Sequence, residues 1–244
     1  MSERPVTPAE PRQRWRFVVA RAAGPPEQPQ REVAEAWASA IEAAALPVAW
    51  TEGARSRPRI AFGAPLPVGM AANAELIDVV VTERWPAWRV REALADHLPA
   101  GWRLVDLHDV WLAGPPLAGR VAAADYRVLL AGDVPVERLR TAAREIIASQ
   151  QLMRRRARGD DSVEYDLRAL LIDVGVEDVV PVTITARTRI HPEVGTGRPE
   201  EVVAALGERC DLTLEIRSIT RERLILLEDL VPPEPSTVTS TDHD

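Results

Sequence analysis

One order of local patterns occurs twice along the chain, in residues 13–112 and again in residues 124–219. Each stretch runs strand, helix, strand, strand, helix, strand, which is the order of a split βαβ or ferredoxin-like unit. The four antiparallel strands of such a unit carry two helices on one face and leave the other face open. The repeat therefore predicts an α+β fold of tandem duplicated ferredoxin-like units with antiparallel sheets. The open sheet faces, or the cleft between the units, are the expected binding surfaces.

Alternation and helical stripes support this prediction. Residues 15–20 alternate and are rich in β-forming side chains, which indicates a strand. From Arg31 to Leu46 apolar residues recur at steps of three and four, which indicates a helix that ends at Pro47. The other elements of the first unit are expected at 48–50, 59–62, 76–81, 86–98 and 102–112, and those of the second unit at 126–131, 134–153, 163–172, 182–190, 199–209 and 212–219.

Composition sets the limits of the units. We place the first unit at residues 12–114 and the second at 124–230, joined by a linker at 115–123. Residues 1–11 and residues 231–244, which are rich in Pro, Ser and Thr, bury too little apolar surface to offset the entropy lost on ordering. Both ends are therefore expected to be disordered.

Charge and cysteine content exclude several classes of protein. With 30 Lys and Arg against 37 Asp and Glu, the net charge is −7, so no global positive field attracts nucleic acid. The lone cysteine, Cys210, excludes an internal disulfide and any site built from several thiolates. No apolar run approaches the ~20 residues that span a bilayer, and the polar start lacks the apolar segment of a signal peptide. We therefore expect a cytoplasmic protein with no membrane contact.

Arginine clusters are the main candidates for a binding site. Arg55, Arg57 and Arg59 lie in a loop between two short extended pieces, where alternation aims all three in one direction. Guanidinium groups pair with phosphate oxygens through parallel hydrogen bonds, so this loop is a candidate anion clamp. The alternative is a solvated loop in a chain whose cations are all arginine.

A second cluster is expected to end the long helix of the second unit: Arg154, Arg155, Arg156 and Arg158. Cations at a helix C-terminus complement the helix dipole. Four of them within five residues exceed what capping requires. We therefore expect a contact with an RNA backbone or with an acidic partner.

Three further residues complete the predicted binding set. Arg168 shares a predicted strand face with Asp166, where it either orients a ligand or forms a cross-strand salt bridge. His191 and Arg198 lie near a strand end and a helix start, where they either join an anion site or remain on the surface. The sequence has no phosphate loop, nucleophile elbow or HExxH helix, and it predicts no catalytic residue, metal ligand or cofactor.

Seven tryptophans are many for this length. Trp37 and Trp88 fall on helical stripes and are expected in the core. Trp50, Trp102 and Trp111 lie in or beside strands, where core packing is expected and stacking on an exposed base is the alternative.

An ordered set of segments within residues 13–219 carries a resemblance: Leu46–Gly53, Arg57–Phe62, Pro65–Gly69, Glu75–Val79, Tyr126–Val128, Arg154–Arg168 and Arg198–Glu201. This set resembles the bacterial DUF2344 family, whose members are also called radical SAM-linked or radical SAM-associated proteins. Members occur alone or attached to radical SAM enzymes, so the resemblance implies an accessory module. The chain itself lacks the CxxxCxxC thiolates that a [4Fe–4S] cluster needs.

Two departures from that pattern concern the first unit. Gly24–Gln30 stands where the family usually carries a Ser-His-Leu-Asp stretch, and Ala54–Ser56 replaces a glycine-aromatic loop. The chain therefore resembles a diverged member, without the polar site that this His and Asp would form.

Two hypotheses follow. The first is a non-catalytic adaptor that binds RNA or a radical SAM enzyme that modifies RNA. The second is an enzyme, a transferase or nuclease acting on RNA, with its site in the cleft between the units. The second hypothesis requires a titratable group within hydrogen-bond reach of another in that cleft.

Overall fold

The computed structural model describes residues 9–23, 29–52, 56–158 and 161–230. The main elements of its first half are β1 (Gln13–Arg21), α1 (Gln30–Ala43), β2 (Ile60–Phe62), β3 (Ala71–Val81), α2 (Ala87–Leu94) and β4 (Trp102–Val110). Those of its second half are β5 (Val121–Leu130), α3 (Val136–Ala148), β8 (Leu171–Glu177), β9 (Thr183–His191), α4 (Pro199–Cys210) and β11 (Ile216–Leu226). Shorter elements lie between or after them: η1 (Leu117–Gly119), β6 (Met153–Arg158), β7 (Asp161–Asp166), η2 (Arg168–Leu170), β10 (Gly195–Thr196) and α5 (Leu227–Leu230).

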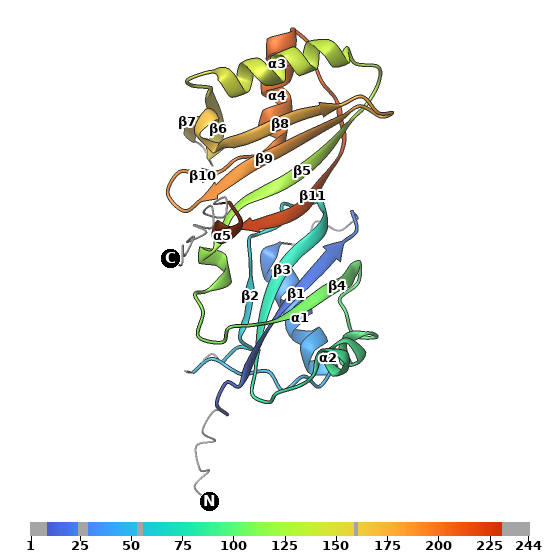
Figure 1. Ribbon diagram of the computed structural model, residues 1–244, viewed down its shortest axis with the longest axis vertical. Helices are drawn as coiled ribbons and strands as arrows, with labels where there is room; N and C mark the ends of the chain where they lie inside the picture. The colour runs from blue at the N-terminus through green and yellow to red at the C-terminus, as the bar shows by residue number, and fades with distance from the viewer. Residues whose placement is uncertain (1–8, 24–28, 53–55, 159–160, 231–244) are drawn as a thin grey trace, which may run out of the picture.

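A single large sheet runs through both halves (Figure 1). In the first half the antiparallel order is β4-β1-β3-β2, and in the second half it is β11-β5-β9-β8. Among the four strands named in each half, the last along the chain lies beside the first, followed by the third and the second. The predicted α+β class with a mainly antiparallel sheet is confirmed.

The expectation of separate antiparallel sheets is corrected at one point. β11 of the second half pairs with β3 of the first half, and this pairing is parallel. It spans two residue pairs, Thr220 with Ala71 and Arg221 with Ala72. This short pairing joins nine of the described strands into one sheet.

Each half packs two helices against one face of the sheet. α1 presents Val33, Trp37 and Ile41 to the strands of the first half, and α3 presents Leu139 and Ile146 to those of the second. These residues form stripes at three- and four-residue spacing, because that spacing returns to one side of a helix. The resulting cores lie at opposite ends of the molecule, with α3 and α4 at the top of Figure 1 and α1 and α2 in its lower half.

The second sheet face of the first half is covered, contrary to the prediction of an open face. Arg14 and Arg16 of β1 lie on this face, and each is only 6% exposed. Both donate to the carboxylate of Asp78 on β3, at 2.8 Å from each Nε. Arg14 also donates to the carbonyls of Gly114 and Pro115, both at 3.0 Å. The segment after β4 therefore crosses this face and is held there by buried hydrogen bonds.

The corresponding face of the second half is open and charged. Asp125 accepts hydrogen bonds from Arg187 (2.7 Å) and Arg223 (2.8 Å). Arg127 pairs with Glu177 at 2.7 Å and with Glu222 at 3.5 Å. Because these charges neutralise one another, the open face offers no strong excess of either sign.

Three local expectations are also corrected. α3 ends at Ala148 rather than near residue 153, and the arginine cluster that follows forms β6, which pairs with β7 in a hairpin. Arg168 lies in η2 rather than on a strand. β5 begins at Val121, inside the predicted linker, which also contains η1.

The tryptophans divide between core and surface. Trp37 is fully buried, as predicted. Trp50, Trp88 and Trp111 are 48%, 65% and 74% exposed, so the expectation of core positions is wrong for these three. Trp111 follows the last residue of β4, and Trp88 is two positions before the buried Val90 of α2, which places it away from the stripe that packs.

Most of the two predicted disordered ends lies outside the described residues, namely 1–8 and 231–244. Among the described helices none is long and apolar enough to cross a membrane.

Candidate binding cleft between the two halves

A cleft of about 590 Å³ lies where the start of α4 faces the segment between β2 and β3. Residues 64–67 of the first half form one wall, and residues 196–201 of the second half form the other. Tyr126 of β5 and Arg221 of β11 line it between these walls. Both halves therefore contribute to one site, which we call the inter-half cleft.

Close packing shapes the wall from the second half. A Cβ on Gly197 would lie 2.7 Å from the Cβ of Thr188, so only glycine allows this approach. The hydroxyl of Thr188 donates to the Gly197 carbonyl at 2.8 Å. Pro199 is the first residue of α4, where its fixed φ suits the helix and its missing N–H removes no hydrogen bond. These interactions hold the turn against β9 and place the exposed Arg198 at the cleft.

A buried ion pair joins the halves at the cleft. Arg221 is 1% exposed and Glu75 of β3 is 4% exposed. The Arg221 guanidinium donates to both oxygens of the Glu75 carboxylate, from Nε to Oε1 at 2.7 Å and from Nη2 to Oε2. It further donates to the carbonyls of Pro65 (3.0 Å) and Ala64 (3.2 Å). One arginine of the second half thus holds a strand and a loop of the first.

Tyr126 extends this buried group. Its side chain is 3% exposed, and burial raises the pKa of its hydroxyl, although the charge of Arg221 and a hydrogen bond with it act in the opposite direction. The hydroxyl therefore stays protonated at neutral pH. Since Glu75 and Arg221 also neutralise each other, the floor of the cleft carries no net charge.

The hairpin of β6 and β7 brings further arginines to the start of α4. Arg154 binds Glu201 (3.3 Å) and Glu208 (2.5 Å) of α4, and its side chain is 13% exposed. Arg155 points to the other side of the strand and pairs with Glu164 at 2.6 Å. Both charges are therefore compensated by neighbouring glutamates.

Arg156 is placed differently. Its guanidinium lies over the ring of Tyr165, 5.2 Å from the centroid, and makes no ion pair within the described part of the chain. The pKa of Tyr165 is raised by burial and by Glu201, and lowered in part by the charges of three arginines, Arg154, Arg156 and Arg198. Arg156 therefore contacts the ring of Tyr165, while Arg154 binds Glu201 of the cleft wall and Arg198 lines the inter-half cleft itself.

Several segments that contribute to this site were picked out by sequence: residues 65–67, Tyr126, Arg154–Arg156 and residues 198–201. The model of a family described as an uncharacterized protein conserved in bacteria, DUF2344, matches residues 29–202. The chain belongs to the DUF2344 family. No curated protein matches it.

Solved structures show weak likeness to this DUF2344 protein. A Cbf5–Nop10–Gar1 complex contains a chain that is 13% identical, with a TM-score of 0.46, over 85% of this chain and 49% of that one. An archaeal box H/ACA sRNP Nop10–Cbf5 complex gives 12% identity and a TM-score of 0.40, over 84% and 47%. An unknown protein from Galdieria sulphuraria gives 14% identity and a TM-score of 0.26, over 84% and 96%. The DUF2344 chain thus spans about half the length of the first two, and at these TM-scores none of the likenesses bears on function.

Two of the predicted binding residues of the DUF2344 protein have structural partners away from the inter-half cleft. Arg168 donates to the carbonyls of Ile147 (2.8 Å) and Leu171 (3.0 Å), so it closes the end of α3. His191 is exposed, and its Nδ1 accepts from the backbone N–H groups of Glu193 and Val194, both at 3.2 Å. Each side chain stabilises a local turn.

The remaining predicted arginines divide as follows. Arg158 ends β6, but its side chain is outside the described part of the structure, and Arg55 is outside it entirely. Arg57 lines a different cavity, between α1 and β2. Arg59 is exposed and does not line that cavity.

Sequence reasoning did not select Glu75, Tyr126 or Arg221 as site residues; Glu75 and Tyr126 appeared only within the segments that resemble the family. No sequence signal marked Glu75 or Arg221, because the strands predicted at 76–81 and 212–219 stop short of both residues, whereas β3 and β11 include them. Among the described residues no three His, Cys, Asp or Glu side chains are grouped so that they could hold a metal ion.

Proposed function

We propose that this DUF2344 protein is a non-catalytic adaptor that binds single-stranded RNA beside the inter-half cleft. The observation that carries the proposal is Arg156 lying over Tyr165 on a hairpin whose Arg154 binds Glu201 of the cleft wall, which Arg198 also lines. In the described part of the chain neither Arg156 nor Arg198 is engaged by a carboxylate, whereas Arg154 and Arg155 are. One available guanidinium group, that of Arg198, lines the cleft, and a second, that of Arg156, lies with Tyr165 on the hairpin that contacts the cleft wall.

The chemistry suits unpaired nucleotides. Guanidinium groups bind phosphate oxygens with two parallel hydrogen bonds and also stack on base faces. Base stacking on an aromatic ring contributes about 1–3 kcal/mol per base. Tyr165 is half-buried, and the guanidinium of Arg156 lies over its ring. A net charge of −7 leaves such binding dependent on this local group rather than on a global field.

We infer further that the two halves are duplicated ferredoxin-like units, the first at residues 12–114 and the second from the start of β5 at Val121 to residue 230. The shared strand order, fourth-first-third-second, supports this inference. The β6–β7 hairpin is an insertion in the second unit, between its first helix and its second strand. It supplies Arg156 and Tyr165, so the proposed site is confined to that unit and to the cleft.

A radical SAM enzyme that modifies RNA is the proposed protein partner. The resemblance noted in the sequence is the ground for this part of the proposal. Purified adaptor and enzyme should then form a complex in size-exclusion chromatography, and RNA should join it without loss of the enzyme.

Catalysis in the inter-half cleft is less well supported. The titratable groups within hydrogen-bond reach of one another there are Glu75, Tyr126 and Arg221. All three are at least 95% buried, and both Glu75 oxygens are occupied by one guanidinium. A carboxylate held in this way stabilises the fold and is poorly placed to accept a proton from a substrate.

Fluorescence anisotropy with labelled single-stranded oligouridylate tests the RNA proposal. Arg156→Glu and Arg198→Glu should each weaken binding by about tenfold. The dependence of log K on log salt should also become shallower by roughly 0.7 for each phosphate that the variant no longer neutralises. Arg84→Glu, an equally large charge change at an exposed position of the first half, is the matched control.

The proposal fails if all three variants bind equally, because the affinity would then follow net charge alone. It also fails if double-stranded RNA binds as well as the single strand. In that case stacking on Tyr165 would play no part.

A further inference from the structure

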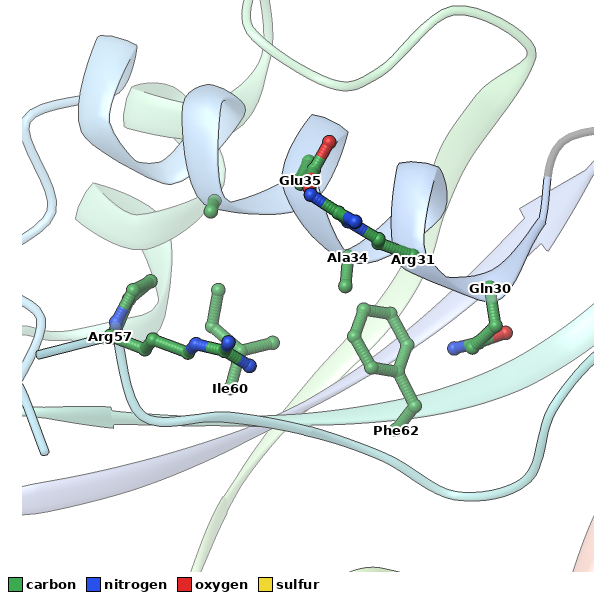
Figure 2. A pocket seen from close by; sticks show the side chains of 9 residues that line it. Gln30, Arg31, Ala34, Glu35, Arg57, Ile60 and Phe62 are labelled. Carbon is green, nitrogen blue, oxygen red and sulfur yellow. The ribbon is translucent and has the colours of Figure 1, made fainter. Parts of the chain in front are cut away.

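A second cavity lies in the first half, between α1 and β2, with a volume of about 700 Å³ (Figure 2). Its floor is apolar and includes Ala34 of α1 and Ile60 and Phe62 of β2. Figure 2 shows Ala34 pointing towards the ring of Phe62, and Arg57 extending over Ile60. Arg31 turns to Glu35 instead and pairs with it at 2.8 Å. The cavity therefore has an apolar floor with a cation at one end.

The strand beside this cavity is an edge of the sheet. In the described part of the chain β2 pairs with β3 alone. The N–H of Val80 donates to the Arg59 carbonyl (3.0 Å), and the N–H of Gly63 donates to the Leu76 carbonyl (2.9 Å). Backbone groups of alternate residues face the same side of an antiparallel strand.

It follows that the Arg59 carbonyl and the backbone groups of residues 61 and 63 are directed to β3, whereas Ile60 and Phe62 direct theirs outward. The Arg59 N–H donates to the Ala49 carbonyl at 2.8 Å. The Ile60 N–H is satisfied locally by the Pro58 carbonyl at 2.8 Å. The Ile60 carbonyl and both backbone groups of Phe62 remain directed along the open edge. They are positioned to pair with one more strand.

Two arginines lie beside the edge. Arg57 and Arg59 are exposed, and neither makes an ion pair with another described residue. Arg57 reaches into the cavity, so an anionic group at one end of a bound segment would meet its guanidinium.

We propose that the groove between α1 and β2 binds an extended acidic peptide segment of a partner protein, which adds to β2 as a new edge strand. Main-chain hydrogen bonds to Ile60 and Phe62 supply affinity in this mode, and pockets for alternate side chains supply selectivity. The cavity beside Ala34 receives an apolar side chain, and Arg57 receives an Asp or Glu side chain. The exposed main-chain groups favour a peptide over a nucleic acid, which cannot continue a β-ladder.

Panning a phage library of random dodecapeptides against the immobilised full-length chain tests this proposal. The enriched sequences should alternate apolar residues and should share an acidic residue at one end. A synthetic peptide of the enriched sequence should bind the wild-type protein in isothermal titration calorimetry. Ala34→Glu, which fills the cavity with a like charge, and Arg57→Glu should each weaken that binding by about tenfold or more.

Ala43→Glu is the matched control, because it makes the same substitution at an exposed position of the same helix away from the cavity. It should leave the affinity unchanged. Glutamate is a good helix former, so Ala34→Glu and Ala43→Glu should both keep α1 folded. Circular dichroism checks that they do. A probe peptide N-methylated at the residue that faces Phe62 should bind at least tenfold more weakly, because one ladder hydrogen bond is blocked.

Three results would overturn the proposal. The library could yield no enriched sequence, the enriched peptide could bind Ala34→Glu as tightly as wild type, or N-methylation at alternate positions could have no effect. An enriched peptide that is displaced by oligouridylate would place it at the RNA site, which also contradicts the assignment to this groove.

Discussion

Replacing Arg221 with methionine leaves the Glu75 carboxylate buried without its partner. Breaking a buried ion pair by removing one member costs about 3–5 kcal/mol, because an uncompensated charge stays in the interior. Arg221 also donates to two carbonyls, Ala64 and Pro65, and each buried acceptor that loses its donor adds about 1–3 kcal/mol unless water replaces it. We therefore expect Arg221→Met to cost at least about 3 kcal/mol of unfolding free energy, or roughly 6–12 °C in Tm for a chain of this size.

Glu75→Gln is the informative companion. The amide keeps the shape and one acceptor, so its cost should be smaller than that of Arg221→Met. The double variant Glu75→Gln with Arg221→Met removes both charges, and its cost should be less than the sum of the two single costs.

Urea unfolding at neutral pH, followed by far-UV circular dichroism, measures the unfolding free energy of the wild type, the two single variants and the double variant. Arg84→Met serves as the control for loss of an exposed arginine and should change stability by less than about 0.5 kcal/mol. Strictly additive costs, or a cost below about 1 kcal/mol for Arg221→Met, would show that the pair is solvated and does not hold the halves together.

Urea unfolding also tests the contribution of other residues to stability. Burial raises the pKa of the Tyr126 hydroxyl. The stability that this residue contributes is therefore complete below about pH 10 and is lost as the pH rises through its folded-state pKa. Tyr126→Phe should accordingly show a smaller fall in unfolding free energy at alkaline pH than the wild type. Burial acts to raise the pKa of Asp125, but hydrogen bonds from its two arginine partners outweigh it and the pKa is lowered. The stability lost in Asp125→Asn should therefore be present at neutral pH and vanish as acid protonates the wild-type carboxylate, which urea titrations across the acidic range will show. Trp37→Ala should cost about 3–5 kcal/mol, whereas Trp111→Ala, at an exposed position, should stay within about 0.5 kcal/mol, as measured by urea midpoints.

Periodicity in the sequence was sufficient to predict the order of elements and the class of the fold. The stripe that includes Trp37 and Ile41 identified the buried face of α1, because helical spacing reports burial directly. The β6–β7 hairpin was not predicted, since a run of arginines has no apolar alternation and follows directly on a helix. Pairing of β11 with β3 could not be predicted, because no local pattern specifies a pairing between strands this far apart in sequence.

The candidate site shows the same division. Arg156 and Arg198 were selected on composition and position; the structure places Arg156 over Tyr165 and Arg198 at the inter-half cleft. The sequence analysis placed the cluster of Arg154, Arg155, Arg156 and Arg158 at the end of a helix, however, where no pattern distinguishes a paired arginine from an available one. Strand alternation separates them instead, turning Arg155 to one side and Arg156 to the other. Glu75 and Arg221 were missed because their burial arises where the two halves meet, which sequence patterns do not report.

The position of β11 has a consequence for how the chain is made. It is the last strand along the sequence, yet it lies in the middle of the sheet, between β5 and β3. A nascent chain on the ribosome therefore exposes two unpaired strand edges until residues 216–226 emerge. Edges of that kind invite self-association. Chains truncated before this strand should aggregate during expression, and any fusion or tag that delays its release should lower the yield of native protein.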